Sequence, residues 1–135
     1  MIIIGLDNGV FIKGYTRVQL PKSFRYPFEK DYESDKVDIC YWRKAWNIRN
    51  WFLNECFPKR EINDYYFNLG IKEVETLRKI ITYYLKHSKE WNETSSIWTF
   101  EEIKSNLKEQ KYNLKVLIKW MKKNPEAEVV FYDSY

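Results

Sequence analysis

The residue best suited to metal chemistry stands near the beginning of the chain. Asp7 follows the apolar run Ile2-Ile3-Ile4, which is typical of a buried strand. A carboxylate at a strand end is the hard oxygen ligand that Mg²⁺ prefers. Catalysis with Mg²⁺ would need further carboxylates, and the later chain shows no obvious partner for Asp7. An aspartate in a turn is therefore the favoured interpretation, and a catalytic metal ligand is the alternative.

A second group of polar residues lies within residues 41–57, among three of the six tryptophans. Arginine, lysine and amide side chains present donors that suit phosphate or carboxylate, and neighbouring indole rings stack on planar ligands. The candidate binding residues are Trp42, Arg43, Lys44, Asn47, Arg49, Asn50 and Trp51.

The same cations have a structural interpretation, which is favoured. Arg43 would pair with Asp7 or Asp38 and act as a clamp between a helix and the sheet. Arg49 lies inside an apolar stripe, where an unpaired charge costs several kcal/mol, so it needs a partner.

Cysteine and histidine are too few for a zinc site: the chain has Cys40, Cys56 and a single histidine, His87. We expect two free thiols, a reducing cytoplasmic environment, and neither a bound metal nor a cofactor. His87 lies in the last turn of a predicted helix, where a charged imidazole would interact well with the helix dipole, so a structural or solvated role is expected.

Composition indicates one folded domain over residues 1–135, with 44% hydrophobic residues and 19% aromatic residues. The aromatic residues are spread along the chain, which favours an aromatic core over a stacking surface. The net charge of +4 comes from interspersed charges and does not by itself predict a nucleic-acid binder. No stretch approaches the 18 apolar residues of a membrane span.

The element expected to organise the fold is a central helix over residues 41–57. Read at 3.6 residues per turn, this segment is apolar over most of its circumference. Asp38 is a plausible N-cap, and Pro58 cannot continue the helix.

The other elements surround that helix. Asn8-Gly9 between β-rich runs predicts a hairpin over residues 2–19, followed by a long irregular loop over 20–38. Residues 64–69 read as a strand and 71–87 as a helix. Thr99 with Glu102 forms a capping box, and Trp98 with Ile103 a hydrophobic staple, at the start of a helix that ends near Lys123. Residues 127–132 predict a final strand. The expected fold class is α+β: three helices packed on a small, mainly antiparallel sheet made of the N-terminal hairpin and the C-terminal strand.

Two resemblances add expectations. The opening Gly5-Leu6-Asp7-Asn8-Gly9 resembles that of RNase H-like nucleases, including small Holliday-junction resolvases, which implies Asp7 as a metal ligand. The central segment resembles a family of small bacteriophage and prophage proteins through its Tyr-Trp-Arg-Lys-Ala motif, followed by an isoleucine and a Trp-Phe pair. The matching residues are Tyr41, Trp42, Arg43, Lys44, Ala45, Ile48, Trp51 and Phe52. That family usually has Asn, Ala and His where this chain has Trp46, Asn47 and Arg49.

The resemblance implies a phage-borne accessory protein without an established activity. The leading hypothesis is a non-enzymatic binding protein in the host cytosol that acts on a host component, for example by inhibiting a defence system. The alternatives are a nucleotide or nucleic-acid binder that uses Arg43 and Lys44, and a metal-dependent nuclease that uses Asp7. The partner would be a host protein or an anionic nucleotide or nucleic acid.

Overall fold

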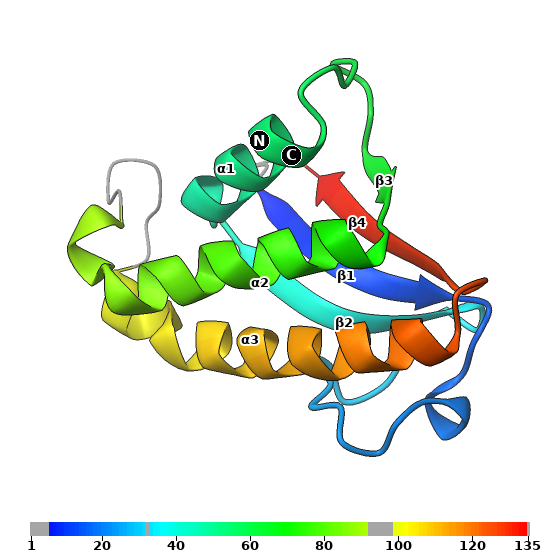
Figure 1. Ribbon diagram of the computed structural model, residues 1–135. Coiled ribbons are helices and arrows are strands. Elements are labelled where there is room, and N and C mark those ends of the chain that lie inside the picture. The colour runs from blue at the N-terminus through cyan, green and yellow to red at the C-terminus, as the bar shows by residue number, and fades with distance from the viewer. Residues whose placement is uncertain (1–5, 32, 92–98, 135) are drawn as a thin grey trace, which may run out of the picture.

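The structure is a computed structural model that describes residues 6–31, 33–91 and 99–134 (Figure 1). The described residues form an α+β fold, as predicted, with three α-helices and a four-stranded antiparallel sheet. The elements are β1 (Asp7–Lys13), the 3₁₀ helix η1 (Arg17–Gln19), β2 (Lys36–Arg43), α1 (Trp46–Cys56), β3 (Tyr66–Asn68), α2 (Ile71–Lys86), the 3₁₀ helix η2 (Ser88–Glu90), α3 (Phe100–Lys123) and β4 (Glu128–Ser134).

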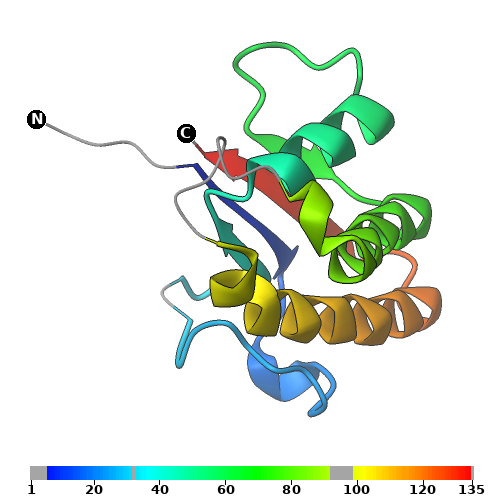
Figure 2. The same cartoon turned by 90° about the vertical axis from the view of Figure 1, so that its left-hand side faces the viewer.

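The molecule has two layers. The strands lie in the order β2-β1-β4-β3, and α1, α2 and α3 cover one face of that sheet, with α2 between the other two helices (Figures 1 and 2). The core lies between the layers. It takes alternate residues from each strand, such as Val10 and Ile12 of β1 and Val129 and Phe131 of β4, which are buried against the helices.

The predicted hairpin over residues 2–19 is wrong. β1 is a central strand, paired along its whole length with β2 on one side and β4 on the other, so Asn8 and Gly9 lie inside a strand and not in a turn. The expectation for residues 2–4 lies outside the described residues. The strand that pairs with β1 begins only at Lys36, because residues 14–35 form a long irregular connection with one short 3₁₀ helix.

The predicted central helix is wrong at its start. Residues 41–43 end strand β2, where Trp42 lies opposite Asn8 and Arg43 opposite Asp7. Lys44 has a left-handed backbone, with φ of 56°, which breaks the strand before α1 begins at Trp46. Asp38 therefore lies inside β2 and caps no helix.

The sequence of β2 resembles that of a buried helix because the strand's alternation of buried and exposed residues is interrupted. Val10 pairs with Cys40 while Phe11 pairs with Asp38, so Ile39 is an extra residue in β2 and forms a bulge. Val37, Ile39, Cys40 and Trp42 are consequently all buried, and the segment reads as apolar on several sides, like a buried helix.

The other predicted elements are confirmed within a few residues. β3, α2, α3 and β4 fall where strand 64–69, helix 71–87, the capped helix and strand 127–132 were expected. The capping box is formed by Thr99 Oγ1, which accepts a hydrogen bond from the Glu102 amide, and by Glu102 Oε2, which accepts one from the Thr99 amide. Trp98, the first half of the predicted staple, lies outside the described residues. Cys40 and Cys56 are free thiols, as expected.

Helix α3 also closes the outer edge of the sheet. Asn113 Nδ2 donates to the carbonyl oxygen of Ile39 at 2.9 Å, and Asn106 Nδ2 donates to that of Tyr41 at 3.4 Å. Both carbonyls belong to the edge strand β2, which would otherwise present unpaired acceptors. The orientation of α3 on the sheet is thereby fixed, and with it the direction in which its outer face points.

Gly9 lets an aromatic ring lie against the opposite face of the sheet. A Cβ atom at position 9 would lie 2.5 Å from the Tyr132 ring and 2.5 Å from the backbone oxygen of Cys40. We expect Gly9→Ala to lower the free energy of unfolding by about 1–3 kcal/mol, because a central strand cannot yield to both contacts. Urea denaturation measures the change.

Gly14→Asn is the matched control for this substitution. Gly14 has a left-handed φ of 82°, and a Cβ atom added there would meet nothing within 4 Å, so Gly14→Asn brings backbone strain, which asparagine bears better than most residues, but no packing clash, and we expect the smaller loss. Equal losses of stability in the two variants would contradict the packing explanation for Gly9.

Candidate functional site

The first three candidate binding residues do not share a surface. Trp42 is 2% exposed on the helix-covered face of the sheet, where its ring lies 6.5 Å from that of Phe131. Arg43 is exposed at the end of β2, in register with Asp7. Lys44 occupies the turn that follows, where its amide donates to the carbonyl of Leu6.

The remaining candidates belong to α1. Trp51 packs against α2, with its ring 5.1 Å from that of Tyr83 and 5.7 Å from that of Tyr84. Asn47 is half-buried, and Asn50 is exposed next to Arg49. The structure thus brings Arg49 and Asn50 together but places Trp42 and Trp51 in separate packing environments, so the seven residues do not form one site.

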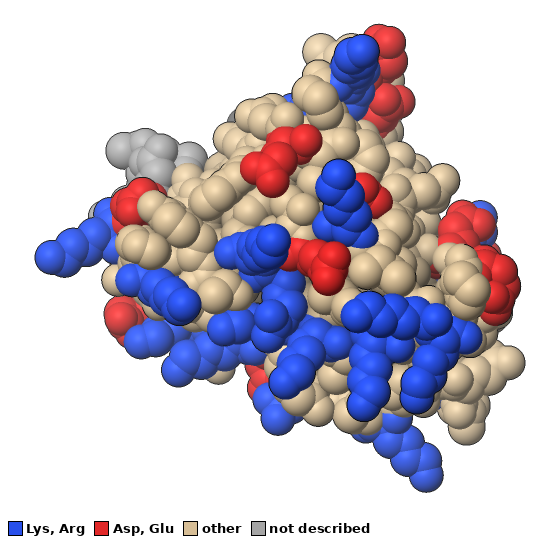
Figure 3. All heavy atoms as spheres, viewed as in Figure 1, with Lys and Arg blue, Asp and Glu red and all other residues tan. Residues whose placement is uncertain are grey.

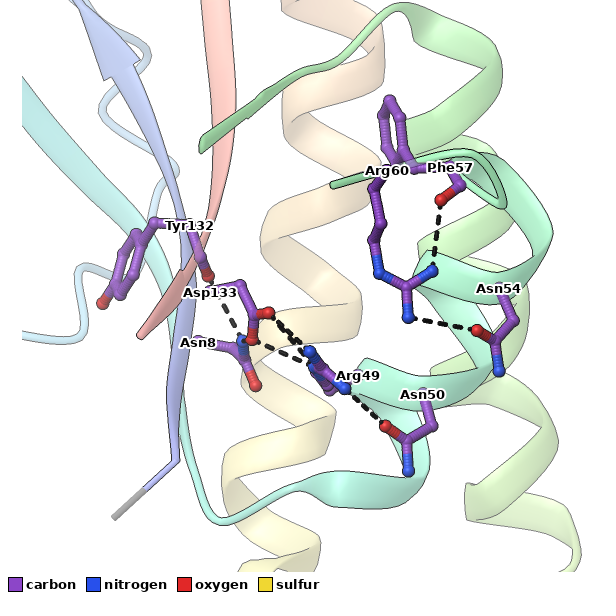
Figure 4. Close-up of polar contacts among 8 residues, drawn as sticks. All are labelled: Asn8, Arg49, Asn50, Asn54, Phe57, Arg60, Tyr132 and Asp133. Atoms are coloured by element: carbon purple, nitrogen blue, oxygen red, sulfur yellow. Dashed lines mark hydrogen bonds and ion pairs between the residues drawn. The ribbon is translucent and has the colours of Figure 1, made fainter. Parts of the chain in front are cut away.

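Arg49 forms the clamp between a helix and the sheet (Figure 4). Its Nε lies 3.1 and 3.2 Å from the two carboxylate oxygens of Asp133 in β4, and its Nη2 lies 2.8 Å from Oδ2. Asn8 Nδ2 of β1 donates to Asp133 Oδ1 at 2.8 Å. The expectation that Arg49 needs a partner is confirmed. The predicted clamp exists, but Arg49 and Asp133 form it in place of Arg43 with Asp7 or Asp38.

The polar cleft beside this clamp has its own cations satisfied. It measures about 370 Å³ and is lined by Arg49, Arg60 and several carboxylates. Arg49 Nη1 donates to Asn50, while Arg60 donates to the carbonyl of Phe57 and to Asn54 Oδ1 (Figure 4). Because protein acceptors already occupy these donors, the arrangement stabilises the fold more readily than it binds an anion.

Asp7 is engaged in a hydrogen bond with a tyrosine. The Tyr41 hydroxyl donates to Asp7 Oδ1 at 3.0 Å. Burial of Tyr41, together with this hydrogen bond and the nearby Asp7 charge, raises the pKa of Tyr41 to about 12. Among the described residues no group of three or more His, Cys, Asp or Glu side chains is placed to hold a metal ion. The nuclease hypothesis therefore gains no support from the geometry around Asp7.

His87 ends α2, where its ring stacks on Tyr83 with ring centroids 4.1 Å apart and its Nδ1 lies 3.0 Å from the Tyr83 carbonyl oxygen. This local packing agrees with the structural role expected from the sequence.

A continuous row of lysines runs along the outer face of α3. Lys104, Lys108, Lys111, Lys115, Lys119 and Lys122 follow one another at intervals of three or four residues, which places them on one side of the helix. Lys123 adds a seventh lysine, against three glutamates, so α3 alone accounts for the whole net charge of +4. Figure 3 shows basic side chains gathered in a band where α3 runs in Figure 1.

These lysines border a hollow between α2 and α3. The hollow measures about 420 Å³ and is lined by Arg78, Leu85, Lys104, Lys108, Lys111, Tyr112 and Lys115. Arg78 reaches across from α2, and its Nε donates to the carbonyl of Lys111 at 3.3 Å. Five cations thus surround one hollow, and no carboxylate of the described residues lines it. We call this surface the basic hollow.

The lysines of the basic hollow differ from the cations of the clamp. Within residues 6–31, 33–91 and 99–134, no lysine of α3 lies within 4 Å of a carboxylate oxygen, whereas Arg49 makes an ion pair at 2.8 Å. Because these lysines are separated by two or three other residues in the sequence, they do not form a run of consecutive like charges. Their regular spacing from 104 to 122 is the sequence feature that indicates this surface.

Comparison of the chain with protein-family models, with curated proteins and with solved structures gives no match in any of the three. Within the described residues, no helix has both the length and the apolar character required to cross a membrane.

The clamp is tested by removing one partner at a time. Arg49→Met leaves the carboxylate of Asp133, a residue 1% exposed, without its cation, and we expect a loss of about 3–5 kcal/mol in the free energy of unfolding. Asp133→Asn should also destabilise, because it removes the counter-charge of Arg49.

The double variant Arg49→Met/Asp133→Asn should recover a large part of either loss, since it leaves no buried charge unpaired. Chemical denaturation of the four proteins gives the coupling energy. Losses that simply add in the double variant would show that the two side chains do not act as a pair.

Proposed function

We propose that the protein is a non-enzymatic binding protein whose basic hollow and adjoining α3 lysines bind the phosphate backbone of a nucleic acid. One observation carries this proposal: five cations from two helices surround a single hollow, and none of its described lining residues is a carboxylate. Like charges held this close repel one another, and an anionic occupant relieves that repulsion.

The extent of the row favours a linear polyanion over one small anion. From Lys104 to Lys122 the helix rises about 27 Å, at 1.5 Å per residue. In a nucleic-acid duplex, a strand presents a phosphate about every 3.4 Å along the axis, so the row extends beside several successive phosphates. Lysine contacts of this kind release condensed counterions, which makes binding sensitive to salt and tolerant of sequence.

This proposal keeps part of the hypothesis drawn from the sequence and changes the residues. A nucleic-acid binder was one alternative, but the cations now assigned to it belong to α2 and α3, while Arg43 and Lys44 lie at the end of β2. A phage accessory protein that acts on a host component in the cytosol stays a prediction, and a nucleic acid of the host would be one such component.

The proposal predicts a specific change in salt dependence. Lys104→Ala/Lys108→Ala removes two cations of the basic hollow and retains good helix formers. We expect the affinity for a labelled oligonucleotide to fall about tenfold or more at low salt. The slope of log K against log salt concentration should decrease by about 2, because two phosphate contacts are lost. Fluorescence anisotropy at several salt concentrations measures both quantities.

Lys30→Ala/Lys59→Ala is the matched control, since it removes two exposed lysines that belong neither to α3 nor to the lining of the basic hollow. This control should bind like the parent protein. Polyglutamate serves as a competitor that carries charge without phosphates. Equal affinity of both double variants for the oligonucleotide, or displacement by polyglutamate as effective as by unlabelled oligonucleotide, would contradict the proposal.

A further inference from the structure

Helix α3 also borders a second, apolar groove next to the basic hollow. It measures about 430 Å³ and lies between α3 and the connection that joins β1 to β2. Its lining residues are Pro21, Ser23, Tyr112, Lys115, Val116, Lys119, Trp120 and Lys123. We call it the aromatic groove, because Tyr112 and Trp120 contribute rings and three lysines add cationic groups.

Hydrogen bonds hold the two walls of the aromatic groove together. The Arg25 amide donates to Asn113 Oδ1 at 2.9 Å, and Asn113 Nδ2 donates back to the Arg25 carbonyl at 2.7 Å. The Arg25 guanidinium lies 4.0 Å from the centre of the Tyr112 ring, and Tyr15 packs edge-on against Trp120 at 5.2 Å. Figure 2 shows the connection running alongside α3. The groove is therefore preformed, so little ordering of the protein is needed when a ligand binds.

The aromatic groove and the basic hollow meet on α3. Tyr112 and Lys115 line both, so a ligand that lies across the helix at these residues contacts the two at once. One side offers five cations, and the other offers an apolar surface with aromatic rings beside three lysines. A ligand that matches both sides carries regularly repeated negative charges together with flat apolar groups.

We propose that the preferred ligand is single-stranded nucleic acid, with its phosphates in the basic hollow and one or two bases in the aromatic groove. This inference rests on the proposed function and names its substrate class. The bases of a single strand are free to turn toward an apolar, aromatic surface, whereas those of a duplex are stacked and paired inside the helix. The groove therefore discriminates between two ligands that carry the same backbone charge.

The test varies the groove without changing charge. Val116→Gln places a larger neutral polar side chain in the aromatic groove, at a half-buried position of α3. Ser105→Gln, at an exposed position of the same helix, is the matched control. Thermal unfolding establishes that each variant remains folded, and Tyr112→Leu provides a second groove variant that keeps an apolar side chain but removes the ring.

We expect the parent protein to bind a single-stranded oligonucleotide about tenfold more tightly than a duplex of the same sequence at equal phosphate concentration. Val116→Gln should reduce the affinity for the single strand about tenfold and leave that for the duplex unchanged. Tyr112 also lines the basic hollow, so Tyr112→Leu should weaken binding of the single strand more than binding of the duplex. A tenfold reduction is about 1.4 kcal/mol, which is the size of effect expected when one stacked base contact is lost. Ser105→Gln should match the parent protein on both ligands.

A position-specific readout accompanies the affinities. A single strand that contains 5-iodouracil should crosslink to Tyr112 or Trp120 under ultraviolet light, as identified by mass spectrometry of tryptic peptides. Crosslinks found only outside the groove would overturn the inference.

The outcomes separate this inference from the proposed function. Equal effects of Val116→Gln on single strand and duplex, or no effect on either, would overturn the single-strand preference and leave backbone binding by the basic hollow in place. Failure of the parent protein to bind either ligand would overturn both proposals. If the groove variants instead lost affinity only for an acidic amphipathic peptide, the groove would be a site for a protein partner, and the inference would be wrong.

Discussion

The placement of α1 on the sheet depends on the partly buried ion pair between Arg49 of α1 and Asp133 of β4. Removing both charges from water costs several kcal/mol per ion, and only near-ideal geometry and additional hydrogen bonds offset that cost. Both conditions hold here, because the guanidinium contacts both carboxylate oxygens and Asn8 donates a further hydrogen bond from the neighbouring strand. Ile48, Phe52 and Leu53 of α1 are buried in the core, and the ion pair adds a directional contact that ties this helix to one position on β4.

The sequence predicted the elements that are determined locally. Helix α3 has a capping box at Thr99 and Glu102 and a clear apolar stripe, so its start and its buried face follow from neighbouring residues. The β1–β2 pairing was missed because it joins residues about 30 positions apart across an irregular connection. Asn8-Gly9 was read as a turn, yet the missing Cβ of Gly9 makes room for Tyr132, which lies more than 120 residues further along the chain. Nothing near position 9 in the sequence indicates that contact.

In the candidate site, too, some features follow from local sequence patterns and others only from the packing of distant elements. The cations selected from the sequence were those among apolar residues, and the structure shows that Arg49, the most enclosed of them, is paired within the protein. A larger group of cations, none of them paired with a carboxylate among the described residues, lies in the periodic row on α3, whose spacing can be read from the sequence alone. What no local pattern reveals is that Arg78 joins this row from α2, or that the described lining of the hollow between the two helices includes no carboxylate. Those facts depend on how α2 and α3 pack.

The two faces of helix α3 have opposite effects on the stability of the fold. Its inner face contributes buried residues such as Leu107, Leu114 and Leu117 to the core, and Asn113 ties it to β2. Its outer face brings lysines into mutual repulsion, at a cost of about 0.2–0.5 kcal/mol for each neighbouring pair on the helix. The fold tolerates this cost because the inner face holds the helix in place. A polyanion bound along the row would remove the repulsion, so binding and folding stabilise each other. Lys122 and Lys123 lie in the last turn, where cations stabilise the helix, but the repulsion along the rest of the row is a cost that the proposed ligand would remove.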